Sequence, residues 1–358
     1  MGVAGVAFSI MLMFVQLGFF GAVIIGATQL YDNFRYDLVI VSKDYTFIHA
    51  PRSFPRRRLL QAVSHRDVAA THAVYLGSAP WHNRETGLRN SVTLIGVNPG
   101  TPVFRNASIN RHLDGLRRRD TALVDSQTRP KYGPRPAGSL VEIAGRKVRI
   151  LDEYVLGTSF VDLAMLVVSD LNFTRLQPHH SHEHAGLGLI VLRGGADPDI
   201  VAGELRRLVP GDVHVWTRAR FRRHEVRHWL LLTSTGLIFG SGVAIALVVG
   251  AVILYQTVST QIITRMNEYA TLKAIGYAPW QILLVVLEQA LTISLLGFLP
   301  GLLAAWGLYV MVERLALLPM VLTVERTTLV LALVVVMSLV SGGLAYRKVH
   351  VADPAELF

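Results

Sequence analysis

Cysteine is absent from the 358 residues of the chain, and charged residues are scarce. The missing thiols exclude disulfide frameworks, thiolate zinc sites and catalytic cysteines. Charged residues make up 17% of the chain and hydrophobic residues 51%, whereas a typical soluble protein is about 25% charged. With a mean hydropathy of +0.41, this composition argues against a disordered chain and against a wholly soluble one.

Motifs for nucleotide hydrolysis and for common hydrolytic chemistry are also missing. The sequence contains no G-x-x-x-x-G-K-[ST] loop, so the chain does not supply an ATPase by that route. It also contains no G-x-S-x-G and no H-E-x-x-H, which removes two frequent catalytic arrangements. We therefore predict a non-catalytic protein that binds no cofactor itself.

Long stretches without charge dominate the sequence instead. Four runs contain no Asp, Glu, Lys or Arg, and each approaches or exceeds the roughly 20 residues that cross a bilayer. One such run could be a buried core helix, and the first could be a signal peptide, but it lacks a basic n-region and is too long. We predict four transmembrane helices. The uncharged runs are 1–31, 229–264, 289–312 and 327–346.

The segment between the first two runs has the pattern of a globular domain. It carries the whole net charge of +10, because the rest of the chain holds six basic and six acidic residues. Asp197 and Pro198 suit the N-cap and first turn of a helix. We predict one α+β domain, in one or two lobes, that ends in a βαβ-like unit. The predicted strands are 37–42, 187–193 and 213–217, a hairpin covers 140–155, and helices cover 55–63 and 198–208.

Basic residues near the apolar runs bear on orientation. Four basic residues follow the second and fourth runs, whereas two lie between the third and fourth runs. Because the positive-inside rule places the more basic side in the cytoplasm, this difference favours a large domain outside the cell. The arginines of 218–227 favour the reverse, although long domains translocate largely regardless of charge. A reversed topology, with an anionic cytoplasmic partner, is the second interpretation. The clusters at 56–58, 117–119 and 218–227 lack the patterns of nucleic-acid readers and suit solvent, anionic lipid headgroups or an acidic adaptor surface.

A short helix is predicted between the second and third runs. Gly276 suits its C-terminal cap, and Pro279 suits the start of the next helix. Spacings of three and four place its side chains on shared faces. Such a helix either docks into a groove of another protein or is a solvated connection. The candidate contact residues are Arg265, Glu268, Tyr269, Leu272, Lys273, Ile275, Gly276 and Tyr277.

Small and acidic residues within the apolar runs are further candidates. Gly236 and Gly240, and Gly297 and Gly301, form G-x-x-x-G patterns that allow helices to approach closely, within a chain or between copies. Glu288 is the one carboxylate in an apolar stretch, and intramembrane acids are functional candidates. Exposure at the interface or an interhelical hydrogen bond are equal alternatives to a relay role.

Histidines gather at 179–184. His180, His182 and His184 alternate, so in an extended strand they could bind Zn²⁺ or Cu²⁺ from one side. The flanking Pro178 and Gly186 mark a loop, and an exposed loop tip without metal is the simpler interpretation. No metal site is therefore predicted.

Five stretches resemble the FtsX/MacB-type permeases of ABC systems and, among these, the DevC permeases of heterocyst glycolipid export. They cover almost the whole chain in the same order and spacing. The stretches are Asp37–Ser42, Ser53–Leu59, Ser169–Phe173, Glu268–Tyr277 and the tail Arg347–Lys348 with Ala352–Phe358.

The resemblance implies a homodimer whose copies each pair with a separate ABC ATPase, which binds ATP and Mg²⁺. It implies that 265–277 is the coupling helix that touches the ATPase, and that motion reaches the outer domain by mechanotransmission. A periplasmic adaptor (membrane fusion) protein completes such systems. Members of the family have a basic stretch before the first span, whereas this sequence has no charge before Asp32.

The expected protein is an α-helical membrane protein of the bacterial inner membrane, with four transmembrane helices and a large inserted α+β extracytoplasmic domain. We expect an ABC exporter permease for a lipid-like or other envelope substrate. The alternative is an FtsX-like unit that controls a cell-wall hydrolase. The expected segments are transmembrane helices at 1–30, 228–258, 282–312 and 327–346, the extracytoplasmic domain at 31–227, a coupling segment at 259–281, a short extracytoplasmic loop at 313–326 and a cytoplasmic tail at 347–358.

Overall fold

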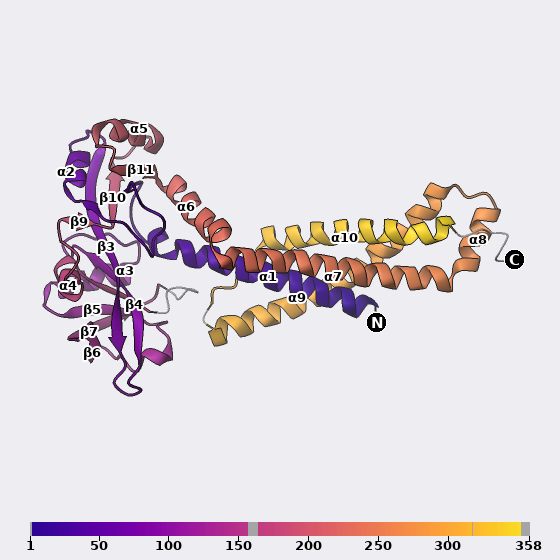
Figure 1. Cartoon of the computed structure of the whole chain (residues 1–358), viewed down its shortest axis with the longest axis horizontal. Coiled ribbons are helices and arrows are strands. Elements are labelled where there is room, and N and C mark those ends of the chain that lie inside the picture. Colours follow the sequence, from indigo (N-terminus) through magenta and orange to yellow (C-terminus); the bar gives the residue numbers. More distant parts are fainter. Residues whose placement is uncertain (1, 157–163, 317, 352–358) are drawn as a thin grey trace. The chain divides into compact units, whose positions relative to one another are not determined.

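The computed structural model describes residues 2–156, 164–316 and 318–351, and the chain divides into two compact units. Unit 1 combines residues 1–22 with 234–358, and unit 2 comprises 23–233. Long helices make up unit 1, and unit 2 is built around a β-sheet (Figure 1). The expected combination of apolar helices with a large inserted α+β domain is confirmed.

Four helices are long and apolar enough to cross a membrane, with mean hydropathy between 2.2 and 2.7 over their most apolar stretches; three lie in unit 1, and the first helix continues from unit 1 into unit 2. Helices that are apolar on every side are buried in protein or in lipid. The four are α1 (Gly2–Asp32), α7 (Ser234–Thr264), α9 (Pro279–Ala316) and α10 (Val324–Val351). A π-helical turn, η3 (His228–Leu232), precedes α7, and the short helix α8 (Met266–Ala274) separates α7 from α9.

Contacts along α1 fix the directions of its neighbours. Gly2 lies against Thr257 and Gly5 against Ile253, so α1 and α7 run antiparallel. The aromatic rings of Phe19 and Phe239 continue this pairing, with centroids 5.3 Å apart. The N-terminus of α1 therefore lies at the same end of the bundle as the C-terminus of α7.

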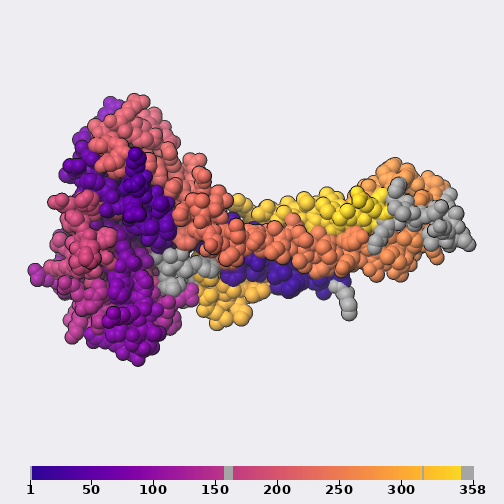
Figure 2. Space-filling model, in the orientation of Figure 1, coloured from indigo at the N-terminus to yellow at the C-terminus, as the bar shows by residue number. Residues whose placement is uncertain are grey.

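Helix α10 runs antiparallel to α9. Gly342 packs on Leu287, and the Ser338 hydroxyl donates to Ser294 Oγ at 2.8 Å. The surfaces of α7 and α10 lie side by side (Figure 2). Consequently α8 and the C-terminus of α10 share one end of unit 1, and the connection between α9 and α10 lies at the other. The chain also leaves towards unit 2, and returns from it, at that second end.

The sheet of unit 2 has nine strands in the order β11-β1-β10-β3-β4-β8-β5-β7-β6, and β3 also pairs with β6. The long strand β3 pairs with β10 along its first half and with β4 along its second. Because β3 pairs with both β4 and β6, the strands β3, β4, β8, β5, β7 and β6 form a closed ring. The strands are β1 (Leu38–Ser42), β3 (Val68–His82), β4 (Arg89–Val97), β5 (Thr121–Asp125), β6 (Leu140–Ile143), β7 (Arg146–Tyr154), β8 (Met165–Ser169), β10 (Leu187–Leu192) and β11 (Val213–Thr217).

Both faces of strands β11, β1 and β10 are covered, which explains why β1 is a continuous apolar run. Leu38 and Ile40 belong to one hydrophobic cluster, together with Leu59 of α2 and Leu205 of α5. Val39 and its alternate neighbours point into another cluster, with Phe221 and other aromatic residues. The helices of unit 2 are α2 (Arg57–Val63), α3 (Ala107–His112), α4 (Asp170–Leu176), α5 (Pro198–Leu208) and α6 (Arg218–Arg227), with 3₁₀ turns η1 (Leu113–Arg117) and η2 (Pro130–Tyr132).

The βαβ-like unit predicted at the end of this domain is confirmed, with one difference. Helix α5 begins at Pro198, and the Asp197 carboxylate caps it by accepting from the Asp199 amide at 2.8 Å. Strands β10 and β11 are parallel but not adjacent, because β1 lies between them and is antiparallel to both. The predicted hairpin is formed by β6 and β7, and its turn has positive φ at Ala144 and Gly145.

Candidate functional site

The short helix predicted between the second and third apolar runs is α8. Glu268 lies in its first turn and Lys273 in its last, where each charge is favoured by the helix dipole. Helix α7 extends to Thr264, so the segment expected at 259–281 begins within α7. Its final turns stay helical because Val258 and Ile262 are buried in the bundle.

The end of α8 is a Schellman motif, which fixes the turn into α9. The Tyr277 amide donates to the Leu272 carbonyl at 3.0 Å, and the Gly276 amide donates to the Lys273 carbonyl at 3.2 Å. Gly276 has φ of +99°, a conformation that a side chain would strain. Helix α9 starts at Pro279, as predicted. The Tyr346 hydroxyl of α10 donates to the Pro279 carbonyl at 2.9 Å, so three helices hold this turn.

One buried and two half-buried polar side chains fasten α8 to the bundle. The Tyr269 hydroxyl donates to Gln289 Oε1 of α9 at 3.4 Å. The Gln289 side-chain amide donates in turn to Gln261 Oε1 of α7. Burial raises the pKa of the Tyr269 phenol above its usual value, so the hydroxyl keeps the proton that it donates. This chain of hydrogen bonds links α8 to both neighbouring helices, so that displacing α8 must strain the bonds or move the helices.

The opposite side of α8 and its turn is an exposed edge of mixed character. Arg265 and Glu268 are exposed, and the Ile275 side chain is 72% exposed. Tyr277 and Trp280 extend the edge as exposed aromatic residues. Leu272 and Lys273 are half-buried. An apolar and aromatic surface with charges beside it is typical of a protein contact.

Glu288 faces away from the bundle. It is exposed on α9, one turn from the exposed Leu284 and from Thr292. The neighbouring Gln289, and not Glu288, makes the interhelical hydrogen bonds. Glu288 is thus placed to meet the surroundings of the helix rather than a second helix of this chain.

The two glycine pairs behave differently. A Cβ on Gly301 would lie 2.7 Å from the Ala7 carbonyl oxygen, and one on Gly297 would lie 3.2 Å from the Ala7 nitrogen. This pair therefore lets α9 pack against the backbone of α1. Gly236 is buried, whereas Gly240 is exposed, with no atom within 4 Å of an added Cβ.

The histidine loop is held by hydrogen bonds rather than arranged as a ligand set. His182 Nε2 lies 3.2 Å from Asp170 Oδ2, and its Nδ1 lies 3.4 Å from an Arg56 guanidinium nitrogen. Its ring also stacks on Tyr75. His180 packs edge-on against Phe173, and His184 is exposed in the short strand β9 (His184–Ala185). The three imidazoles thus have different environments.

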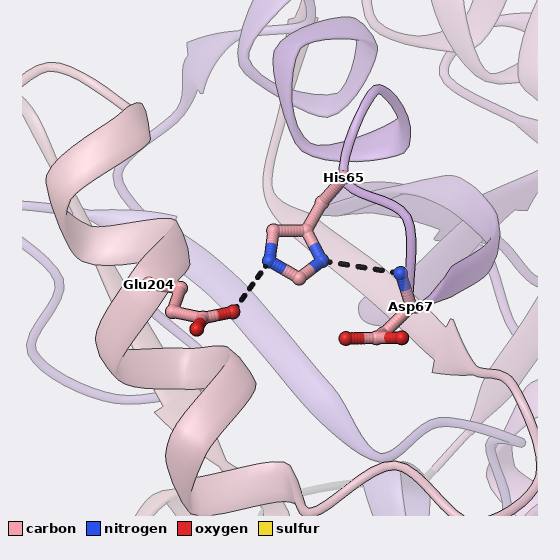
Figure 3. Close-up of side chains that lie close together, drawn as sticks. All are labelled: His65, Asp67 and Glu204. Carbon is pink, nitrogen blue, oxygen red and sulfur yellow. Dashed lines mark hydrogen bonds and ion pairs between the residues drawn. The ribbon is translucent and has the colours of Figure 1, made fainter.

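Among the described residues, three metal-ligand side chains come within 4.8 Å of one another at His65, Asp67 and Glu204 (Figure 3). His65 Nδ1 accepts the Asp67 amide at 3.2 Å, so the proton of the neutral ring is on Nε2, which lies 2.8 Å from Glu204 Oε2. A metal on Nε2 would displace that proton to Nδ1, against the amide. The arrangement suits a hydrogen bond between the loop after α2 and α5 better than a metal site.

The predicted basic clusters are partly neutralised. Arg58 forms a bidentate contact with Asp212, at 2.8 Å for its closest atoms. Arg117 lies 3.2 Å from Asp114, and Arg218 lies 3.3 Å from Asp32. Arg58 is buried in its ion pair, whereas the Arg117–Asp114 pair is exposed to solvent.

Sequence patterns did not identify the hydrogen bonds that join Tyr269, Gln289 and Gln261 beneath α8. Gln261 and Gln289 are uncharged, so each stands at the edge of an apolar run without interrupting it. The sequence feature that could have identified them is a side-chain amide in a predicted membrane helix, because an unpaired polar group there is costly and needs a hydrogen-bond partner. Which helix each amide faces depends on the packing of the bundle.

Comparison with known proteins gives one family match. Residues 229–352, which contain α7 to α10, match the family described as FtsX-like permease C-terminal. The periplasmic region of MacB from Actinobacillus actinomycetemcomitans is similar over 54% of this chain and 94% of that chain, with 9% identity and a TM-score of 0.38. The extracellular domain of the noncanonic ABC-type transporter YknZ from Gram-positive bacteria is similar over 51% of this chain and 99% of that chain, with 16% identity and a TM-score of 0.34. No curated protein matches the chain.

Proposed function

We propose, from the premise that residues 229–352 belong to the FtsX-like permease family, that this chain is the membrane permease subunit of an ABC transporter. The observation that carries the proposal is α8, a capped helix within the matched segment, fastened to α7 and α9 and exposed along one edge. ATP is hydrolysed by a separate ABC ATPase, which docks on that edge.

The proposed topology follows from the directions of the helices. Helices α1, α7, α9 and α10 span the bacterial inner membrane, and α8 lies in the cytoplasm with the C-terminus of α10. Arg265, Lys273 and Arg347 then lie inside, as the positive-inside rule favours. Unit 2 and the connection between α9 and α10 lie outside.

The proposed mechanism is mechanical. Closure of the ATPase pushes α8, and the Tyr269–Gln289–Gln261 hydrogen bonds pass the displacement to α7 and α9. Helix α7 is continuous from Ser234 to Thr264, so motion at one end is transmitted along its length to the segment that leads into unit 2. Two copies of the chain form the membrane part, and unit 2 engages a periplasmic adaptor. The transported molecule is a lipid-like or other envelope substrate.

Docking is tested by crosslinking. The chain has no cysteine, so Ile275→Cys introduces a single thiol on the exposed edge of α8. Treatment of the complex formed by co-expression with the cognate ABC ATPase, using a short thiol-to-amine crosslinker, should join the two proteins. Leu315→Cys, equally exposed at the other end of α9, should not. Equal crosslinking from both positions, or none from Ile275→Cys in a complex that forms, contradicts the docking site.

Coupling is tested by Glu268→Ala, which removes an exposed charge from α8. We expect substrate export to fall about tenfold, the effect of losing roughly 1.4 kcal/mol at the contact, while ATP hydrolysis continues. Glu313→Ala removes an exposed carboxylate at the other end of α9 and is the matched control. Unchanged export in the Glu268→Ala variant would contradict the role of this residue.

The same family match also allows a regulatory unit, in which unit 2 activates a cell-wall hydrolase. The neighbouring genes separate the two functions, because an exporter requires an adaptor and a regulator requires a hydrolase. Both functions use α8 in the same way.

A further inference from the structure

Unit 2 contains a hollow that the proposed transport mechanism does not use. Its volume is about 460 Å³, within the range of small-molecule sites. The short strands β2 (Phe54–Pro55) and β9 pair beside it, and α2 begins at its edge. The hollow is lined by Pro55, Arg56, Arg57, Leu60, His182, Glu183 and His184.

Among the described residues, no carboxylate contacts the Arg56 guanidinium directly, and other groups hold it in place. Its backbone amide donates to the Glu183 carbonyl at 2.7 Å, and its guanidinium lies 3.4 Å from His182 Nδ1. His182 Nε2 lies 3.2 Å from the Asp170 carboxylate. If Nε2–H donates to Asp170, Nδ1 accepts from Arg56, so both contacts are satisfied by a neutral ring. The imidazole and the Tyr75 hydroxyl, which also interacts with Arg56, fix part of the guanidinium, and its remaining N–H groups are left for a ligand.

The charge of the lining favours an anion. Arg57 is exposed, and no ion pair joins it to another described residue. Glu183 is the acidic lining residue, and Asp170 is buried behind His182, outside the lining. Two arginines, one glutamate and two histidines thus line the hollow. A planar guanidinium group can donate two parallel hydrogen bonds to a phosphate. Two such groups therefore match a phosphate, which has three acceptor oxygens, better than a single carboxylate, which has two.

An apolar wall accompanies the charged one. The Leu60 side chain is 68% exposed at the edge of the hollow, and Pro55 lies beside it. Burying a leucine side chain is favourable, so a ligand that covers Leu60 gains binding free energy beyond its anionic group. The hollow therefore offers an amphiphile contacts for both of its parts.

The geometry points to a binding site for a phosphate monoester carried by a small amphiphile, with Arg56 and Arg57 on the phosphate and Leu60 on the apolar part. His182 is a positioning residue that holds Arg56. The site lies wholly within unit 2, so it does not depend on docking of an ATPase at α8.

Calorimetric titration of the full chain, in nanodiscs of phosphatidylcholine, tests the site. The probes are dihexanoyl phosphatidic acid, dihexanoyl phosphatidylcholine, inorganic phosphate and an octaglutamate peptide. We expect saturable binding of the phosphatidic acid, and binding about tenfold weaker in Arg57→Gln, as for loss of one charge-assisted contact. Arg52→Gln is the matched control, because Arg52 is exposed and does not line the hollow.

Arg57 is exposed, so its substitution should leave the melting temperature unchanged, and Arg56→Gln is the second variant. Phosphatidic acid that binds more tightly than inorganic phosphate supports the amphiphile. Equal affinity for the two supports a phosphate site whose ligand is free phosphate. Absence of binding, equal binding in all variants, or equal binding of phosphatidylcholine would overturn the site. Arg57-dependent binding of octaglutamate alone would replace it with a protein contact.

Discussion

Glu225 of α6 is a carboxyl group with no exposed surface. The Tyr45 hydroxyl donates to it at 2.5 Å, and the Ile48 amide donates at 3.3 Å. Burial raises the pKa of Glu225 from 4.5 to about 7, against the opposing effect of these two donors. The charged form is therefore disfavoured in the folded protein, although both donors remain available to it.

This pKa predicts how stability depends on pH. A carboxyl whose pKa is higher in the folded state than in the unfolded state stabilises the fold fully below the unfolded pKa, and that contribution is lost as pH rises. Stability should therefore fall between about pH 4.5 and pH 7, by on the order of 3 kcal/mol in total. In Glu225→Gln this loss should be absent, because the amide does not ionise in that range.

Thermal unfolding of the full chain between pH 4.5 and pH 8 measures the effect. Glu85→Gln, at an exposed carboxylate of the same unit, is the control and should retain the pH dependence of the original chain. An equal pH dependence in Glu225→Gln would show that other groups cause it.

His182 shows what residue types alone leave undecided. Alternating histidines predict a shared face only if the segment is an extended strand. The structure instead places His182 between Arg56 and Asp170, residues distant from each other in the sequence. The composition of the loop suggested coordination chemistry, and only the folded neighbours show that both ring nitrogens are already hydrogen-bonded.

Elements defined by local signals could be predicted well. Asp197 with Pro198 located the start of α5, and Gly276 with Pro279 located the turn between α8 and α9. These signals act within a few residues, through capping and restricted φ angles. The pairing of β4 with β8 and the closure of β3 on β6 were not predicted, since they join distant segments.

The packing of α9 on α1 gives a prediction about helices. A Cβ on Gly301 would meet the Ala7 carbonyl oxygen at 2.7 Å, and backbone cannot move aside cheaply. Gly301→Ala should therefore destabilise the chain by about 1–3 kcal/mol, as overpacking does. The thermal unfolding midpoint in detergent measures the change.

Gly307→Ala is the matched control on the same helix. No atom lies within 4 Å of a Cβ at this position, so the variant should be neutral or slightly more stable through helix propensity. Equal destabilisation by both substitutions would place the effect in α9 itself and not in its contact with α1.

The proposed topology of the whole chain can be measured with single cysteines, since the chain has none. Ala137 is exposed in unit 2, and Ile275 is exposed beside α8. In intact cells, an impermeant maleimide should label Ala137→Cys within minutes and label Ile275→Cys at least tenfold less, because the membrane excludes the reagent from the cytoplasm.

Lysed cells provide the reference for this labelling, since both cysteines should then react. If Ile275→Cys reacts in intact cells while Ala137→Cys is protected, α8 faces away from ATP, and the permease assignment fails. The number and order of the apolar helices could be predicted from uncharged runs. The side of the membrane could not, because the arginines at 218–227 oppose those near α8.

The contact between Gly301 and Ala7 also has a consequence for biosynthesis. These partners are separated by roughly 300 residues, which a ribosome adds in roughly 15–60 s at typical rates. During that interval α1 has been made, but α9, whose glycines pack against Val6, Ala7 and Ile10 of α1, has not. A helper protein that shields α1 until α9 is synthesised would therefore promote assembly without remaining in the finished protein.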